Sequence, residues 1–186
     1  MNRTTTLPWI ALWLSALLLT GCAATTSSST GQEALDPQAR WAMLPVINNT
    51  ETPQAGLAVE ALVEHHLRAR GVVQLQRYPA ALSRESLFEA SERKLAEEAQ
   101  TWARDQGARY AITGSVEEWR YKIGLDGEPV AGVTLRVIEL DSGRVVWSGS
   151  GARSGWSRDG LSAVGQQLIS RLLGELRLTP FQANRS

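Results

Sequence analysis

The sequence predicts an α/β protein of the α+β kind, with a single mixed sheet and helices packed on it. Two patterns carry this prediction. As far as Gly107, short apolar runs alternate with stretches in which apolar residues recur at helical spacing. From Tyr110 onward, apolar and polar residues alternate with a period of two, which is typical of half-buried strands. The expected element order is β-α-β-α-β-β-β-α, in which the last three strands form a C-terminal antiparallel meander.

The first predicted strand is 40–47, an apolar run that ends in turn residues. Pro45 cannot donate a hydrogen bond to a neighbouring strand, so we expect an edge or a bulge there. Thr52 and Pro53 have the chemistry of an N-cap and a first helical residue. A helix is therefore predicted from these residues to Gly71.

The remaining elements follow from the same periodicities. A short strand at 72–77 leads to a second helix, which opens at Ser83 and stops at Gly107. The strands of the meander are predicted at 110–123, 130–140 and 144–152. Gly143 is expected in a left-handed turn between the last two strands. A final helix is expected to begin after a capping Asp159.

The N-terminus has the features of a bacterial lipoprotein signal. A positive charge at Arg3 precedes an apolar segment, 7–19, and the small residues Thr20 and Gly21 precede Cys22, the only cysteine of the chain. A thiol at this place is the acceptor for diacylglycerol, and palmitate completes the expected acylation. The alternative is an ordinary secretory signal with an incidental cysteine. Because the residue after the cysteine is not aspartate, the pattern favours the periplasmic face of the outer membrane.

These features predict a chain with one folded domain. Residues 1–21 form the signal peptide, and 22–39 are expected to comprise the lipidated cysteine and a disordered Ser/Thr-rich tether with an r.m.s. span of about 20–25 Å. A periplasmic α/β domain at 40–178 is followed by a C-terminal tail at 179–186. A domain of this size can bury a proper hydrophobic core.

The charges and titratable residues argue against several classes of function. Lys plus Arg and Asp plus Glu both number 19, so no broad basic field is available for nucleic acid. His65 and His66 point about 100° apart on a helix and cannot chelate one metal. Glu117 and Glu118 are expected on opposite faces of a strand, which makes a poor acid/base pair. We therefore expect no enzyme activity, no metal and no cofactor.

Two loops are candidates for a functional role. The loop at 124–129 contains Asp126 and Glu128 between Gly and Pro, with no nearby base, which predicts an exposed acidic tip; simple turn formation is the alternative. The loop that begins at Ser154 contains Trp156 and Arg158 among small and polar residues. Trp156 is expected at a membrane or subunit interface, or else folded back over the core.

Five segments of the chain resemble the PelC family, the outer-membrane lipoproteins of the Pel exopolysaccharide export system. They are 40–45, 49–56, the hairpin of Asp126 and Gly127, 143–148, and 155–157. The segment Thr-Pro-Gln-Ala-Gly at 52–56 and the Trp-bearing loop are fairly specific, whereas the opening strand and helix also occur in lipoproteins with the TolB or CsgG type of α/β domain.

The resemblance implies a particular assembly and role. It implies a homo-oligomeric ring, a dodecamer, that lies under the outer membrane and coaxial with the PelB export barrel. The ring would guide a cationic amino-sugar polysaccharide through an acidic funnel. By position, the resemblance places Asp126, with Glu128 beside it, in the acidic ring and Trp156, with Arg158, at the membrane-facing rim.

Two other functions remain open from the residues. A lipoprotein of this kind could dock on and activate a cell-envelope enzyme such as a peptidoglycan synthase, which predicts a monomer. An enzyme that acts on polysaccharide would instead need two carboxylates about 5–10 Å apart across a sugar cleft.

Overall fold

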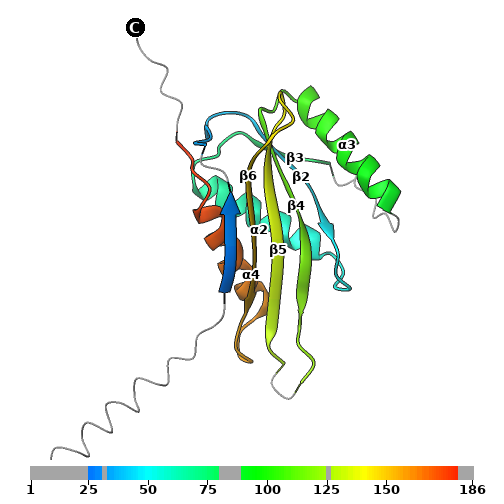
Figure 1. Cartoon of the computed structure of the whole chain (residues 1–186), viewed down its shortest axis with the longest axis vertical. Coiled ribbons are helices and arrows are strands. Elements are labelled where there is room, and N and C mark those ends of the chain that lie inside the picture. The colour runs from blue at the N-terminus through cyan, green and yellow to red at the C-terminus, as the bar shows by residue number, and fades with distance from the viewer. Residues whose placement is uncertain (1–24, 31–32, 80–88, 125–126, 180–186) are drawn as a thin grey trace, which may run out of the picture.

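The computed structural model of the 186-residue chain describes residues 25–30, 33–79, 89–124 and 127–179. They form one mixed sheet with the strand order β1-β6-β5-β4-β2-β3. Two helices, α2 and α4, pack together on one face of this sheet, and α3 lies against part of the other face (Figure 1). From Trp41 onward the order is β-α-β-α-β-β-β-α, as predicted. An additional strand, β1, precedes it.

The parallel part of the sheet forms around strand β2 (Trp41–Asn48), which pairs with β4 on one side and with β3 (Leu75–Arg77) on the other. The register of β2 against β4 shifts between Met43 and Val46. The bulge predicted at Pro45 is thereby confirmed, because the shift spans the residue that has no N–H to donate.

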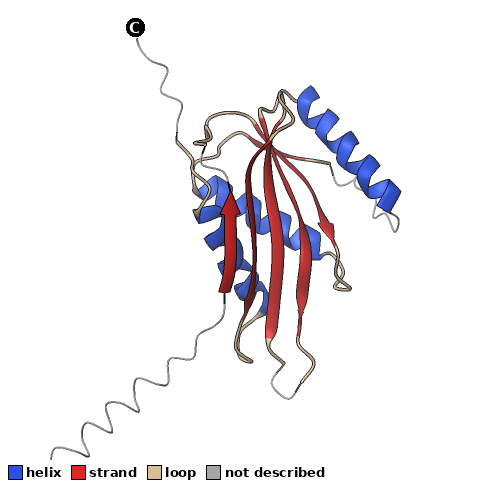
Figure 2. Ribbon diagram, in the orientation of Figure 1, coloured by secondary structure: helices blue, strands red, loops and turns tan. Residues whose placement is uncertain are grey.

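The antiparallel meander is confirmed. Its strands are β4 (Tyr110–Tyr121), β5 (Pro129–Glu139) and β6 (Val145–Ser154), and each pairs with the next (Figure 2). Gly143 has a φ of 70°, so the predicted left-handed glycine closes the turn between β5 and β6. The helix α3 (Glu89–Asp105) ends before Gly107, which has a φ of 69°. The predicted start of that helix at Ser83 lies outside the described residues.

The predictions of Thr52 and Asp159 as N-cap residues are both wrong, because the side chain of each forms a hydrogen bond elsewhere. The helix α2 (Ala55–Ala69) begins three residues after Thr52, whose hydroxyl donates a hydrogen bond to the carbonyl of Trp119. The helix α4 (Leu161–Gly174) has Gly160 as its N-cap residue. Asp159 accepts a hydrogen bond from the backbone N–H of Trp156 at 2.8 Å and so stabilises the preceding loop instead.

The main core lies between the sheet and the pair α2 and α4. The rings of Trp41 and Tyr110 contact each other there, tilted by 45° with centroids 4.9 Å apart, and Leu168, Leu172 and Leu173 of α4 are fully buried. A Cβ on Gly165 would lie 2.1 Å from the Trp119 ring, so glycine allows α4 to approach the sheet this closely. A smaller cluster under α3 contains Trp102, whose ring meets that of Tyr78 edge-on at 5.4 Å.

The predicted tether is wrong in part, because some of it is ordered. β1 (Thr25–Thr30) pairs antiparallel with β6 over its whole length. Leu35 is fully buried, and its backbone N–H donates to the carbonyl of Arg177 at 2.9 Å. The folded domain therefore begins before residue 40. The signal peptide and the tail from 180 onward lie outside the described residues.

Candidate functional site

The two loops singled out by the sequence lie at the same end of the sheet. Strands β4 and β6 run in the same direction, so the hairpin after β4 and the loop after β6 meet (Figure 1). The N–H of Gly155 donates to the carbonyl of Pro129 at 2.8 Å, and the N–H of Leu161 donates to the Tyr121 hydroxyl at 3.1 Å. We call this region the hairpin end and define it as the described residues 121–124, 127–129 and 154–161.

Trp156 projects from the hairpin end into solvent. Its side chain is 61% exposed, so the alternative in which it folds back over the core is wrong. The loop that carries it is constrained, because a Cβ on Gly155 would lie 2.5 Å from Val164 and 3.0 Å from Pro129. The Asp159 carboxylate holds the loop from the other side through the Trp156 N–H. An exposed indole on a constrained loop is suited to contact with another surface. Arg158, two residues further along this loop, is also exposed.

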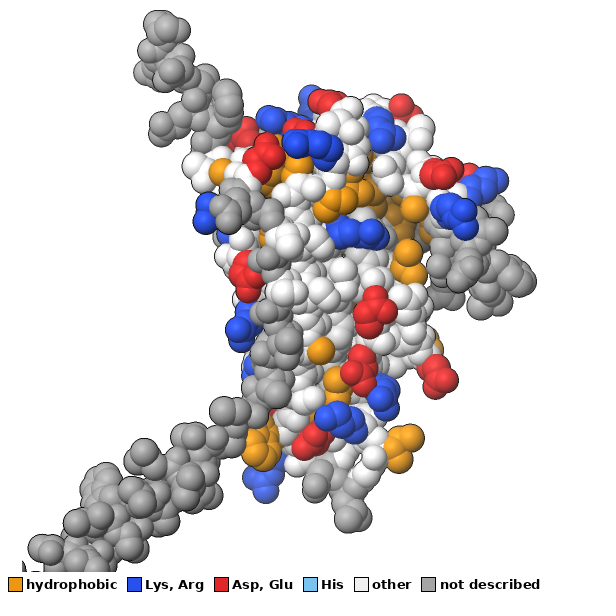
Figure 3. All heavy atoms as spheres, in the orientation of Figure 1, with side chains coloured by type: hydrophobic (Ala, Val, Ile, Leu, Met, Phe, Trp, Pro, Cys, Tyr) orange, Lys and Arg blue, Asp and Glu red, His pale blue; other side chains and the backbone are white. Residues whose placement is uncertain are grey.

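Two further apolar side chains, which the sequence analysis did not single out, are exposed at the same end. Tyr121 is 51% exposed and Ile123 is fully exposed. Both residues fall within the predicted strand 110–123. Their spacing of two residues fits a half-buried strand, so the sequence does not indicate that these side chains lie beyond the core. Figure 3 shows hydrophobic side chains near the lower end of the molecule beside charged ones.

Glu128 has a base beside it, which corrects the expectation of a hairpin loop with no nearby base. Its carboxylate lies 3.4 Å from the Lys122 ammonium, because the hairpin brings these residues together and the Lys122 N–H donates to the Glu128 carbonyl at 2.7 Å. The loop at 124–129 itself contains no base, but Lys122, which faces Glu128 across the hairpin, lies beside it. Asp126 and Cys22 lie outside the described residues, and their predicted roles stay predictions.

Glu117 and Glu118 lie on the same face of the sheet, which corrects the prediction of opposite faces. The β4–β5 register shifts between Val116 and Glu118, and this bulge turns Glu117 toward the face that α2 and α4 leave open. Both residues line a shallow hollow of about 480 Å³ there. Glu117 accepts a hydrogen bond from Asn49 at 3.1 Å, and Glu118 pairs with Arg120 at 2.8 Å.

The two histidines of α2 differ in their exposure. His65 is exposed and His66 is half-buried beside α4. Burial lowers the pKa of His66, and the neighbouring His65 lowers it further. Among the described residues, no group of three or more His, Cys, Asp or Glu could hold a metal ion. No described helix is long and apolar enough to cross a membrane.

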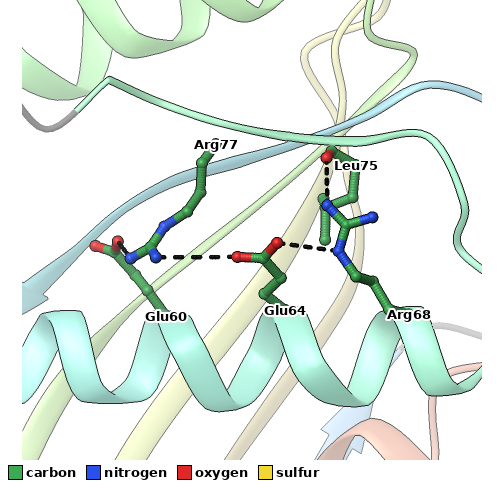
Figure 4. Close-up of polar contacts among 5 residues, drawn as sticks. All are labelled: Glu60, Glu64, Arg68, Leu75 and Arg77. Atoms are coloured by element: carbon green, nitrogen blue, oxygen red, sulfur yellow. Dashed lines mark hydrogen bonds and ion pairs between the residues drawn. The ribbon is translucent and has the colours of Figure 1, made fainter.

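Glu60 is a buried carboxylate with a structural task. It accepts a hydrogen bond at 3.0 Å from the N–H of Val46, which the bulge at Pro45 frees from pairing in the sheet. It also pairs with Arg77 at 2.7 Å (Figure 4). Arg68 of the same helix donates to the carbonyl of Leu75 at 2.9 Å. The cluster therefore attaches the short edge strand β3 to α2.

Replacing Glu60 with alanine is expected to destabilise the fold by about 1–3 kcal/mol, because the buried N–H of Val46 would lose its acceptor. Glu60→Gln keeps an acceptor and should cost less. Glu64→Ala is the control on the same helix; it removes partly exposed ion pairs with Arg68 and Arg77 but leaves no buried N–H without an acceptor, so it should cost about 1 kcal/mol or less. Urea unfolding measures all three, and equal losses for Glu60→Ala and Glu64→Ala would contradict this role.

Comparison with known proteins identifies relatives among solved structures. A PelC dodecamer from Paraburkholderia phytofirmans has a TM-score of 0.72 and 41% identity, over 84% of this chain and 99% of that one. A leucine-to-methionine variant of that PelC has a TM-score of 0.73 and 41% identity, over 84% and 100% of the two chains. Lipoprotein GNA1162 from Neisseria meningitidis, with a TM-score of 0.52 and 16% identity over 73% and 96%, shares the fold. Nothing matches among family profiles or curated protein sequences.

The similarity to PelC extends over 84% of this chain and nearly the whole of the solved chains. An identity of 41% over this length is well above the level at which only a fold is shared. The chain therefore belongs to the PelC family.

Proposed function

We propose that this protein is a lipidated, non-enzymatic component of Pel exopolysaccharide export. It forms a ring at the periplasmic face of the outer membrane and guides a cationic amino-sugar polymer to the export barrel, PelB. The observation that carries the proposal is the 41% identity to PelC chains that assemble as a dodecamer. The lipoprotein signal that ends at Cys22 supports the membrane location.

A ring gives weakly charged subunits a strong local field. The chain is neutral overall, but a carboxylate at the same place in every subunit is repeated around the symmetry axis. Low-dielectric walls focus the summed field in the opening. In this proposal Asp126 supplies the repeated charge, and Glu128, which is paired with Lys122, adds less. Exposed carboxylates bind each sugar weakly, so the polymer can move on.

The other two functions receive less support. The carboxylates of Glu117 and Glu118 share a shallow hollow, but one is hydrogen-bonded to Asn49 and the other is paired with Arg120. Both carboxylates are thus engaged by neighbouring polar side chains. Activation of a cell-envelope enzyme predicts a monomer, in contrast to the dodecameric relatives.

The oligomeric mass tests the proposal. The lipidated protein, extracted in a mild detergent, is expected to sediment as a ring of about twelve subunits, as its PelC relatives assemble. The lipidated form is needed because membrane attachment concentrates the subunits. A monomer both in detergent and after crosslinking in membranes would overturn the ring and favour the enzyme-activator function.

Trp156→Ala is expected to weaken assembly or export and to leave thermal unfolding nearly unchanged, because the indole is exposed in the isolated chain. Val145→Ala is a matched control, since Val145 is 52% exposed at the start of β6, the opposite end of that strand. If Trp156→Ala lowered the free energy of unfolding by about 3–5 kcal/mol, the indole would belong to a core and not to an interface. Equal effects of both variants on export would remove any special role for Trp156.

A further inference from the structure

His66 lies where the two helices that cover the main core meet. It belongs to the last turn of α2, which packs against α4 on one face of the sheet (Figure 1). Together with residues of α4 it lines a shallow groove of about 470 Å³. The other lining residues are Ala163, Gln166, Gln167, Ser170 and Arg171. The proposed function gives this histidine no task.

The surroundings of the His66 ring suit its neutral form. The Nε2 atom is buried and has no hydrogen-bond partner among the described residues. The ring forms a hydrogen bond with the backbone of Gln166, and this bond therefore comes from the other nitrogen, Nδ1. Protonation turns Nε2 into a second N–H donor and gives the ring a positive charge. Both are unfavourable at a buried atom that faces no acceptor.

The groups around His66 on the two helices are basic. Arg171 is the only charged residue of α4, which contains no Asp or Glu. Arg70, one turn beyond His66, donates hydrogen bonds to two carbonyls at the end of α4. The ring of His65 meets that of His66 edge-on, with centroids 5.4 Å apart. Glu175 follows α4 and is exposed to solvent.

The remaining neighbours of α2 do not supply a compensating negative charge. Its own carboxylates, Glu60 and Glu64, take part in the cluster with Arg68 and Arg77 that attaches β3. Among the described residues that β2 and β4 contribute to the main core, the only titratable side chain is Tyr110. Burial raises the pKa of this tyrosine, which keeps it neutral. A protonated His66 would therefore be an uncompensated charge.

The resulting dependence of stability on pH has a definite sign. Burial, and then the neighbouring His65, lower the pKa of His66 from its ordinary value of 6.5. The fold is therefore stabilised by the neutral ring, fully at pH values above 6.5, and this stabilisation is lost as the pH falls below that value toward the pKa of the folded chain. The C-terminal turn of a helix favours cations, but Arg68 and Arg70 already lie there.

We propose that His66 is a pH-sensitive latch between α2 and α4. The neutral ring lets the two helices close against each other, and the protonated ring weakens their packing at mildly acidic pH. Because these helices cover the main core, the latch acts on the stability of the whole subunit. It requires neither lipidation nor a ring, so it does not depend on the proposed function.

Urea unfolding at pH 7.5 and at pH 5.5 tests the latch. The protein is lipidated, held in a mild detergent at one concentration and followed by tryptophan fluorescence. The unfolding equilibrium constant of the unchanged protein is expected to rise several-fold at the lower pH. His66→Gln should remove most of this rise, because an amide carries no charge at either pH. His65→Gln, at the exposed neighbour, is the matched control and should keep most of it.

Carboxylates elsewhere titrate alike in all three proteins, so the difference between the variants isolates His66. Equal pH dependence in the unchanged protein and in His66→Gln would overturn the proposal. A further variant, Gln166→Glu, adds a carboxylate to the groove and should reduce the rise, because a negative charge stabilises the protonated ring. A rise as large as that of the unchanged protein would also overturn the latch.

Nuclear magnetic resonance of ring-labelled histidine gives a measurement that does not depend on how well His66→Gln folds. The chain contains two histidines, so the signal that His65→Gln removes identifies the other as His66. In the unchanged protein, a pKa of His66 below 6.5 supports the latch. A pKa at or above this value would overturn it, because the folded chain would then accept the proton without loss.

Discussion

Cys22→Ser is expected to release the protein from the outer membrane. A hydroxyl does not accept the diacylglycerol, and the buried acyl chains contribute about 0.8 kcal/mol for each methylene, which no exposed side chains of the domain can replace. The variant should therefore move from the outer-membrane fraction to the soluble periplasm or remain as unprocessed precursor. Fractionation with intact-mass measurement detects both outcomes, and export should fall in parallel.

A control variant separates lipidation from sorting. Ala23→Asp keeps the cysteine and should stay lipidated, but aspartate after the cysteine is the pattern of lipoproteins retained at the inner membrane. It should therefore remain membrane-bound and change membranes, whereas Cys22→Ser should leave membranes altogether. Tight binding of Cys22→Ser to the outer membrane would contradict the lipoprotein interpretation, because attachment would then not need the acyl chains.

The order of the elements could be predicted because it depends on local patterns. Near Tyr110 the spacing of apolar residues changes from helical to every second residue, because one face of each helix and one face of each strand is buried in the core. Pro45 predicted a bulge because it lacks a donor, and Gly143 predicted a left-handed turn because it lacks a side chain. Each of these constraints is a property of one residue and survives in any tertiary context.

The errors have a common cause, which is competition from partners distant in the sequence. Thr52 is a good N-cap residue, but its hydroxyl is taken by the Trp119 carbonyl. The segment 25–30 has the composition of a solvated linker, and yet it pairs as β1 because a strand edge needs only backbone groups from its neighbour. Its Ser and Thr side chains do not reveal that β6 has an open edge.

Single residues of the candidate site could be predicted from the sequence, but the surface that they form together could not. The glycine and serine neighbours of Trp156 predicted exposure correctly, since no apolar alternation directs the indole inward. That its loop meets the hairpin of β4 and β5 follows from strand direction, which the predicted meander already implied. Ile123 and Lys122 were missed because they resemble the end of an ordinary strand. Lys122 matters because it neutralises Glu128.

Asp126→Asn is expected to reduce polymer secretion several-fold without changing protein level or oligomeric state. Asparagine tolerates the same turn conformation, so the shape of the hairpin is kept. The change removes one negative charge per subunit, which is twelve charges in a dodecamer like that of the relatives. Asp126→Lys should reduce secretion much further, because every subunit would then repel a cationic chain.

Two variants show whether the position of the charge matters. Asp141→Asn removes the same charge from the exposed turn at the opposite end of the sheet and should leave secretion unchanged. Glu128→Gln removes a carboxylate that Lys122 already neutralises in part, so its effect should lie between those of Asp141→Asn and Asp126→Asn. Binding of the polymer to membranes that contain each variant should follow the same order and weaken with salt, since exposed charges are screened. Normal secretion by both Asp126→Asn and Asp126→Lys would show that the carboxylate at the hairpin does not guide the polymer. An equal fall in secretion in Asp126→Asn and Asp141→Asn would show that only the net charge of the subunit matters.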